Sequence, residues 1–232
     1  MKPAAVNREL ACFRALFRKA VEWERMAVSP MKVVKSFKEV PNPPRMLEHD
    51  EVAKILQELP DRVRALLACA AYAGLRAREI YYLRWTDIRW DEGVLEVVSQ
   101  EEWTTKNNRT RRVPMSSRLA GHLRRNPRRL GSPYVFTNRF GNLFDRMDKF
   151  LRGAAKRAGV PGRVTLHQFR HSFCSHCFMK GTDPHTIQQW MGHRQITTTM
   201  RYAHVSAAHE ESAIERLDFE ETEAMESESR AV

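Results

Sequence analysis

Residues 165–173 read TLHQFRHSF, a stretch that combines a helix start with three polar side chains at helical spacing. Thr165 suits the N-cap of a helix predicted over 166–180, because its hydroxyl can accept a backbone N–H of the first turn. His167, Arg170 and His171 then share one face of that helix. From these residues alone, a structural role and a chemical role are equally well supported.

The residues that follow bring another histidine close to a tyrosine in sequence. Residues 191–205 read MGHRQITTTMRYAHV. Gly192 allows the backbone to turn sharply before His193, and Tyr202 comes nine residues after that histidine. Taken alone, a buried and hydrogen-bonded tyrosine is the simpler interpretation of Tyr202, and a reactive hydroxyl is the alternative.

Two upstream stretches add an arginine and a lysine. AGLRAREI, residues 73–80, places Arg76 and Glu79 three residues apart, on one helical face. WTTKNNRTRRVP, residues 103–114, places Lys106 near the tip of a predicted hairpin. Each has an ordinary explanation by itself, a surface ion pair in the first case and a solvated charged tip in the second.

The rest of the pattern predicts a mainly α fold with a small antiparallel β-sheet (α+β). Apolar residues recur at helical spacing through most of the chain, and Gly74 suits the C-terminal cap of one helix. Between 93 and 114 short strand-like runs replace this spacing, with a turn at Asn107–Asn108. The expected helices cover residues 49–59, 61–73, a short stretch from Arg76, 116–126, 142–159, 166–180 and 184–191, with another around Tyr202.

Prolines separate a short N-terminal part from the main domain. An amphipathic helix is predicted over 4–26, and three prolines between 41 and 44 interrupt regular structure. We therefore expect four parts: residues 1–31, too short to bury a core alone, a linker over 32–46, a main domain over 47–208, and an acidic tail over 209–232.

Charge is distributed unevenly along the chain. The net charge is +11, but residues 205–232 hold nine acidic residues and two arginines, so residues 1–204 carry +18. A basic body of this kind indicates a polyanionic partner, most often nucleic acid. The chain has no run of about 18 apolar residues, so no membrane span is expected. The N-terminus lacks the apolar segment of a secretory signal. Four scattered cysteines fit reduced thiols, so a cytoplasmic, DNA-associated protein is expected.

These residue types match the requirements for cleaving a DNA backbone without a metal. Arginines suit the negative charge on the non-bridging oxygens of a pentavalent phosphate, because the guanidinium donates two parallel hydrogen bonds and stays charged. A lysine or histidine can protonate the leaving 5′-oxygen. A tyrosine hydroxyl can be the nucleophile, but with a pKa near 10 it needs nearby cations or a proton acceptor.

The order and spacing of these residues resemble the catalytic domain of the tyrosine recombinases, the phage integrase family. The resemblance covers about residues 45–208 and rests on four motifs. They are GLR-x-x-E from Gly74, the lysine hairpin followed by R-x-V-P, H-x-F-R-H-S-F from His167, and a Gly-His pair followed nine residues later by Tyr202. Residues 1–31 are similar to the last part of the family's helical core-binding domain.

The resemblance implies the main catalytic roles. Tyr202 would attack the scissile phosphate and form a 3′-phosphotyrosyl link. Arg76 and Arg170 would hold the non-bridging oxygens, and Lys106 would protonate the departing 5′-oxygen. The covalent link conserves the energy of the broken bond, so strand exchange would need no metal and no cofactor.

The resemblance also assigns the supporting residues. His167 and His193 would hydrogen-bond the phosphate and assist proton transfer, and Glu79 would orient its neighbours. The residue types alone do not choose His167 over His171, or Arg76 over Arg78, and the family pattern makes these choices.

The implied activity is site-specific recombination of double-stranded DNA in the integration, excision or resolution of a mobile element. The resemblance further implies a homotetramer on two DNA sites, with accessory DNA-bending or directionality proteins as further partners. AIERLDF in the acidic tail could pack on a neighbouring protomer. Because only a short part of the core-binding domain is expected, a catalytically silent, regulatory DNA-binding remnant stays an alternative. A type IB topoisomerase is a weaker one.

One competing motif is HSFCSHC, residues 171–177. It offers Cys174 and Cys177 with His171 and His176 nearby. Zinc requires four ligands in a tetrahedral arrangement, and only some of these side chains can face the same way on one helix. We expect small thiols that pack the helix and no metal site.

Overall fold

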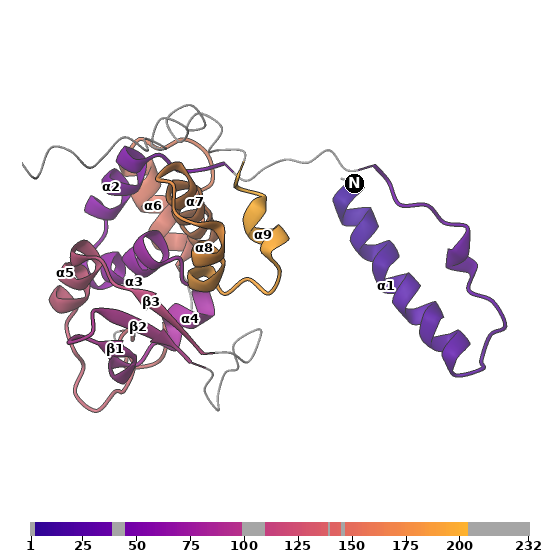
Figure 1. Ribbon diagram of the computed structural model, residues 1–232, viewed down its shortest axis with the longest axis horizontal. Helices are drawn as coiled ribbons and strands as arrows, with labels where there is room; N and C mark the ends of the chain where they lie inside the picture. The colour runs from indigo at the N-terminus through magenta and orange to yellow at the C-terminus, as the bar shows by residue number, and fades with distance from the viewer. Residues whose placement is uncertain (1–2, 39–44, 99–109, 139, 145–146, 204–232) are drawn as a thin grey trace, which may run out of the picture. The chain divides into compact units, whose positions relative to one another are not determined.

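The computed structural model describes residues 3–38, 45–98, 110–138, 140–144 and 147–203, and the chain divides into two compact units, Met1–Pro44 and Arg45–Val232 (Figure 1). Each unit is described by itself. None of the helices in the described residues is long and apolar enough to cross a membrane.

The first unit consists of helix α1 (Pro3–Glu22), the short 3-10 helix η1 (Pro30–Lys32) and an extended segment. Asn7 ties that segment to α1, since its side chain donates to the carbonyl of Phe37 at 2.9 Å and accepts the N–H of Phe37 at 2.8 Å. Helix α1 ends earlier than the predicted residue 26, because Glu24 has a φ of 55°, which is incompatible with a right-handed helix.

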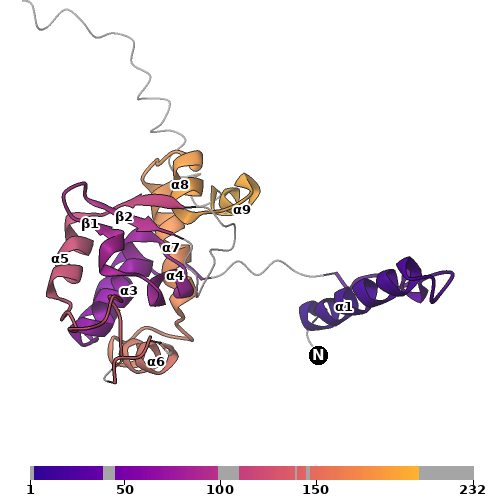
Figure 2. The ribbon, with the colours of Figure 1, turned by 90° about the horizontal axis from the view of Figure 1, so that it is seen from below.

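The second unit is built around helix α3 (Asp61–Ala73), which packs against α5 (Ser117–Arg125) and α7 (Leu166–Met179). Eight of the residues of α3 are buried, so this helix is the centre of the core. The views in Figures 1 and 2 place α5 and α9 (Ile196–Met200) on opposite sides of the unit. The remaining helices are α2 (His49–Gln57), α4 (Ala77–Tyr81), α6 (Asp148–Arg157), α8 (Pro184–Met191) and the 3-10 helix η2 (Trp85–Asp87).

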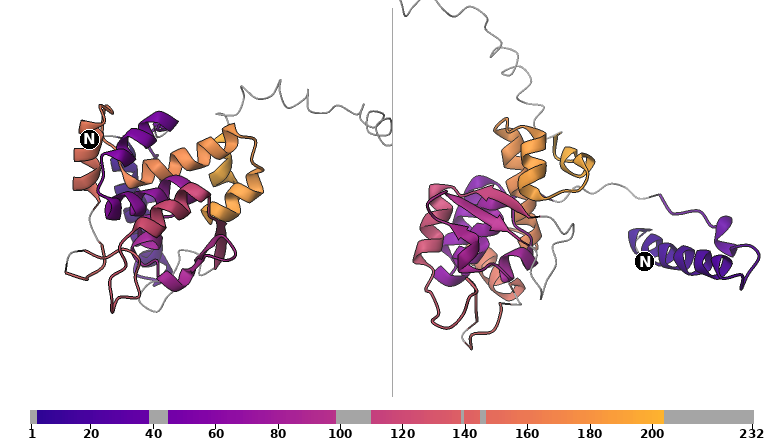
Figure 3. Two further views of the ribbon diagram at one scale, coloured as in Figure 1. Left: turned by 90° about the vertical axis from the view of Figure 1, so that its left-hand side faces the viewer. Right: turned by 60° about the horizontal axis from the view of Figure 1, so that its bottom comes forward.

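Local sequence signals explain where the helices next to the site begin and end. Thr165 caps α7, and its hydroxyl and the side chain of Gln168 form a reciprocal capping box. Gly74 ends α3 and Gly192 ends α8, with φ values of 62° and 61° in the left-handed region. Asp183 caps α8, and Figure 3 shows that α8 is followed by α9 beside it. The predicted caps Thr165 and Gly74 are confirmed.

The sheet has three antiparallel strands in the order β1 (Ile88–Arg89), β2 (Val94–Val97) and β3 (Arg111–Pro114). Leu95 pairs with Val113 and Val97 with Arg111. Leu95, Val97 and Val113 are buried in the core. The mainly α fold with a small antiparallel sheet is confirmed, whereas the predicted turn at Asn107–Asn108 lies outside the described residues.

Two further predicted helices differ from the structure. Helix α6 begins at Asp148 instead of residue 142, because Leu143 forms an isolated antiparallel bridge with Thr137. Helix α9 ends at Met200, so Tyr202 lies in the turn that follows the helix. The backbone N–H of Tyr202 donates to the carbonyl of Thr199 at 3.1 Å and holds this turn.

Candidate active site

A fully buried carboxylate, Glu79, lies at the centre of the site. Its side chain has no exposed surface, and it accepts two hydrogen bonds from Arg111, at 2.9 and 2.6 Å. The side chain and the backbone N–H of Arg76 donate to it at 2.9 and 2.8 Å, and Arg170 lies 4.0 Å away. Burial would raise the pKa of Glu79, but hydrogen bonds and charge from Arg111, with the charges of Arg170 and Arg76, lower it to about 2.

The same three arginines converge on the C-terminal end of α8. Arg111 donates to the carbonyl of Trp190 at 2.8 Å, Arg170 to that of Met191, and Arg76 to that of Gly192 at 2.9 Å. The last carbonyls of a helix have no partner within the helix and carry partial negative charge, so cations suit them. Arg170 also donates to the carbonyl of Gly74 and thereby joins the ends of α3 and α8.

Three arginines and one carboxylate leave the cluster with a net charge of +2, an excess that favours an anionic ligand. Within the described part of the chain, Glu79 is the carboxylate that forms ion pairs with them. Arg170 is only 3% exposed. Burial, followed by the charge of Arg76, lowers its pKa to about 9, so the guanidinium stays charged at pH 7. Partly enclosed guanidinium groups bind phosphate oxygens more strongly than exposed ones do.

Two of the predicted histidines lie beside the arginines in their neutral form. Nδ1 of His193 is 2.8 Å from the hydroxyl of Thr199, a residue with no exposed surface. Burial and the charges of Arg170 and Arg76 lower the pKa of His193 to about 3. Burial and the same two charges also lower the pKa of His167. Neutral imidazoles can exchange protons with a bound phosphate or with a nearby hydroxyl.

Tyr202 points its hydroxyl at a histidine, namely His171. The phenolic oxygen is in hydrogen-bond contact with Nδ1 of His171, and the two ring centroids are 5.4 Å apart. The tyrosine ring packs against a small buried cluster formed by Cys174, Phe178, Ile187 and Met191. Burial, followed by the thiol of Cys174, raises the pKa of Tyr202 to about 12.

The structure brings most of the predicted site residues together. Arg76 and Arg170 lie at Glu79, and the charges of both act on His167 and His193. Tyr202 contacts His171, whose ring lies edge-on to that of His167 at 4.1 Å. Lys106 lies outside the described residues. Glu79 is a buried hub and not the surface ion pair that its motif alone suggests.

Sequence reasoning gave no role to three residues that the geometry places in the site, Arg111, His171 and Thr199. Arg111 shares its strand face with the buried Val113, and this alternation is a signal that separates it from Arg112, which points outward. Thr199 is one of three consecutive threonines, and nothing local distinguishes it.

The side chains of the competing motif HSFCSHC, residues 171–177, have different neighbours. Cys174 packs in the cluster beside Tyr202. Nε2 of His176 lies 2.9 Å from the carbonyl of Leu47, and its ring lies tilted against that of His49, with the centroids 4.3 Å apart. No group of three metal-ligating side chains gathers anywhere in the described ranges.

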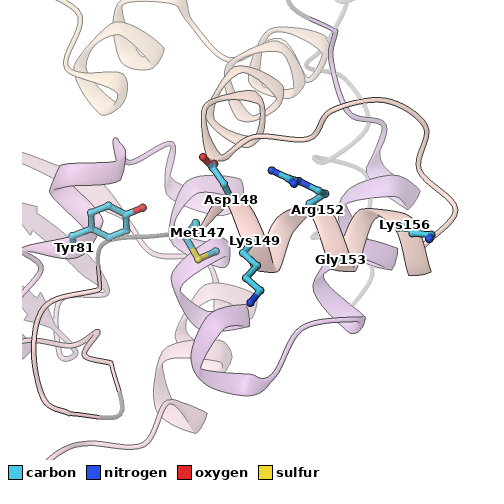
Figure 4. Close-up of a pocket in the computed structure, with 7 residues that line it drawn as sticks. All are labelled: Tyr81, Met147, Asp148, Lys149, Arg152, Gly153 and Lys156. Atoms are coloured by element: carbon cyan, nitrogen blue, oxygen red, sulfur yellow. The ribbon is translucent and has the colours of Figure 1, made fainter.

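A pocket lies along α6, apart from the cluster around Glu79. Tyr81 and Met147 line it together with three basic residues, Lys149, Arg152 and Lys156. Figure 4 shows Tyr81 facing this helix from a separate element. The three basic side chains are exposed and follow one another at helical spacing, so they present a positive stripe to solvent.

Comparison with known proteins gives one consistent answer. The model of the phage integrase family matches residues 45–209. Tyrosine recombinase XerC of Xanthomonas campestris pv. campestris is 30% identical over 219 residues, covering 90% of this chain and 66% of the relative. Tyrosine recombinase XerD of Listeria innocua is 28% identical over 221 residues, covering 88% of this chain and 72% of the relative.

Two solved structures share the fold. The Tn1549 transposon integrase in complex with a circular intermediate DNA matches with a TM-score of 0.77 at 18% identity, over 94% of this chain and 80% of that chain. The crystal structure of XerA recombinase matches with a TM-score of 0.64 at 23% identity, over 93% of this chain and 83% of that chain.

Proposed function

Because the chain belongs to the phage integrase family, whose curated relatives are tyrosine recombinases, we propose that it cleaves and rejoins double-stranded DNA at specific sites through Tyr202. Family membership confirms the resemblance read from the sequence. The observation that supports the proposal for this chain is the cluster of net charge +2 formed by Glu79 and the three arginines that donate to the end of α8. Tyr202 contacts His171, which lies next to Arg170 on α7.

The proposed reaction begins with the phosphate held by arginines. Arg76 and Arg170 hold the two non-bridging oxygens with donors that their carbonyl and carboxylate partners leave available, since a guanidinium has five N–H groups. Fixed positive charge then stabilises the pentavalent phosphate without reorganisation. Glu79 and the end of α8 keep the guanidinium groups oriented.

Tyr202 then attacks the phosphorus and displaces the 5′-oxygen. Lys106 protonates that oxygen, and His167 and His193 hydrogen-bond the phosphate and assist the proton transfers. The product is a 3′-phosphotyrosyl link, which a 5′-hydroxyl of another strand can attack in the reverse direction. The phosphodiester bond energy is conserved, so no cofactor enters the scheme.

Contacts to the DNA backbone are proposed for the α6 stripe. Lys149, Arg152 and Lys156 are exposed cations on a helix that is anchored in the core by Leu151. Phosphate contacts of this kind position a protein on the duplex and carry most of its salt dependence. Helix α6 cannot move away from the duplex without exposing the apolar side chain of Leu151 to water.

The assembly of the active enzyme is also a proposal. A homotetramer on two DNA sites, aided by accessory DNA-bending or directionality proteins, follows from the family and requires a closed ring of protomers. The parts 1–31, 32–46, 47–208 and 209–232 are the proposed domain organisation, and the proposed location is the cytoplasm, with the protein bound to DNA.

The test is covalent capture of DNA. The protein is incubated with nicked suicide duplexes that carry a randomised core, and denaturant-resistant adducts are collected and their DNA sequenced. We expect adducts with an enriched sequence and none with Tyr202→Phe. Binding without adducts would favour the silent remnant, and relaxation of supercoiled DNA without site preference would favour a topoisomerase.

A further inference from the structure

None of the roles proposed above names the group that takes the proton of the Tyr202 hydroxyl when its oxygen attacks the phosphorus. A neutral phenol is a weak nucleophile, and burial raises the pKa of this one to about 12. None of the arginines near the phosphate can accept a proton, because a guanidinium is charged and has no acceptor. The tyrosine therefore requires a separate acceptor within hydrogen-bond reach of its oxygen.

We propose that His171 is a further catalytic residue, the base that takes the phenolic proton of Tyr202 during cleavage. Its Nδ1 is the group that contacts the hydroxyl in this structure, and the ring distance of 5.4 Å agrees with that contact. The inference rests on the proposed function, since it requires Tyr202 to be the nucleophile.

His171 and His167 occupy different places along α7. They are one helical turn apart on the same face, and their rings meet edge-on at 4.1 Å. His171 lies on the Tyr202 side of this pair, and His193 is held through its own Nδ1 by Thr199. The three histidines therefore have different partners. His171 contacts the hydroxyl of Tyr202, while the charges of both Arg76 and Arg170 act on His167 and His193.

Both partners of the contact are held by rigid elements. His171 sits in the middle of a 14-residue helix with a complete N-terminal capping box. The ring of Tyr202 packs on the cluster of Cys174, Phe178, Ile187 and Met191, which belongs to α7 and α8. Catalytic groups need such support, because small misplacements of reacting atoms are costly.

The protonation state of His171 fits an acceptor. Burial, followed by the neighbouring His167 and Arg170, lowers its pKa to about 4, so the ring is neutral at pH 7. For Nδ1 to accept the phenolic proton, the ring proton must reside on Nε2. The titratable groups that act on His171 and Tyr202 are His167, Arg170, Cys174, His193 and Arg201.

A bound phosphodiester makes the transfer easier. Its negative charge offsets the arginines and raises the pKa of a nearby histidine, since opposite charges favour the protonated ring. In the forward step the phenolic O–H breaks and Nδ1–H forms, while Tyr202 bonds to phosphorus. The bond from phosphorus to the 5′-oxygen breaks and that oxygen takes a proton from Lys106. On rejoining, Nδ1–H returns its proton to the leaving phenolate.

The test compares His171→Asn with wild type and with His185→Asn, a change at an exposed histidine of α8 that serves as the control. Asparagine keeps a hydrogen-bonding group but cannot take a proton. We expect single-turnover cleavage of a suicide duplex to fall about 10²- to 10⁴-fold in His171→Asn, the usual contribution of a general base. DNA binding and the thermal midpoint report whether the variant is folded.

A second substrate distinguishes a residue that takes the proton of the nucleophile from a residue that protonates the leaving group. A 5′-bridging phosphorothiolate duplex releases a thiolate that needs no proton, so it should restore cleavage to Lys106→Met and leave His171→Asn slow. Full restoration of His171→Asn on this duplex, or wild-type rates on both duplexes, would overturn the proposal for His171. If wild type itself forms no adduct, the proposed function fails instead. Added imidazole should partly restore His171→Ala.

Discussion

Arg111 and Glu79 form a two-point ion pair, with N–O distances of 2.9 and 2.6 Å, that joins the first residue of β3 to the buried carboxylate of α4. The guanidinium also reaches the carbonyl of Trp190, so a single side chain links the sheet, α4 and the end of α8. Arg76 and Arg170, the two arginines proposed to hold the phosphate, share this carboxylate, and their positions therefore depend on Arg111.

Replacing Arg111 by Met should damage both stability and cleavage. Removing one partner of a buried pair leaves Glu79 with less compensation, and we expect a loss of about 3 kcal/mol in the free energy of unfolding. Adduct formation should fall more than DNA binding, because Glu79 would no longer be held in place to orient Arg76 and Arg170, the arginines proposed to bind the phosphate. The control Arg112→Met alters a side chain that is 51% exposed and should change neither property much. Equal effects from the two variants would contradict a positioning role.

Thr199 offers a second test of positioning. Its hydroxyl contacts Nδ1 of His193, and its carbonyl accepts the N–H of Tyr202. Thr199→Val keeps the shape and removes the hydroxyl, so cleavage should fall about tenfold, the effect of losing one hydrogen bond of about 1.4 kcal/mol. Thr199→Ser should restore the rate, and the exposed Thr197→Val should resemble wild type. A rate for Thr199→Ser as low as for Thr199→Val would indicate lost packing instead.

Stability should decrease as the solution is acidified. The pKa values of His193 and His171 are lowered from 6.5 to about 3 and about 4, so the unfolded chain binds protons first as pH falls below about 6.5. Glu79 acts in the same direction, because the stability that its lowered pKa contributes is complete above pH 4.5 and is lost as the pH falls from 4.5 to about 2. The urea midpoint should therefore fall from pH 7 to pH 4, and His193→Gln should flatten that dependence. A midpoint independent of pH would contradict the buried neutral histidines.

Gly74 should be more sensitive to substitution than another glycine with a similar backbone. Gly74 has a φ of 62°, and an added Cβ would lie 2.5 Å from Cδ1 of Phe173 and 2.8 Å from Sδ of Met191. Gly159 has a φ of 69° with no atom within 4 Å of that position. We expect Gly159→Ala to cost about 1 kcal/mol from backbone strain and Gly74→Ala to cost about 1–3 kcal/mol more from overpacking. Thermal unfolding of both variants measures the difference.

The α6 stripe should contribute to the salt dependence of DNA binding. Replacing Lys149, Arg152 and Lys156 by Gln together should reduce the slope of log K against log salt by about 0.9 for each lost phosphate contact. Lys54→Gln, at an exposed position of α2 that pairs with Asp50, is the control. An unchanged slope in the triple variant would place the DNA on another surface.

The helices next to the site could be predicted from the sequence because their signals are local. Thr165 with Gln168 specifies the start of α7, and Gly74 specifies the end of α3. The start of α6 could not be predicted in this way. Residues 142–147 are compatible with a helix by composition, and a distant pairing between Leu143 and Thr137 decides otherwise.

The candidate site shows the same contrast between local signals and contacts from distant elements. Motif spacing predicted Arg76, Arg170, His193 and Tyr202 as site residues, but partners of these side chains come from other elements. Glu79 was expected to orient its neighbours, yet two of the three arginines around it, Arg111 of β3 and Arg170 of α7, come from other elements. The contact of Tyr202 with His171 arises from the packing of the turn after α9 on α7, and neither sequence spacing nor residue type specifies it.

The most direct test of the central claim is to identify the residue that becomes attached to DNA. Adducts captured on suicide duplexes are digested with nuclease and protease, and the peptides are analysed by mass spectrometry. We predict a nucleotide on the peptide that contains Tyr202 and on no other peptide. A nucleotide on another residue, or DNA that binds wild-type protein without any modified peptide, would contradict the account.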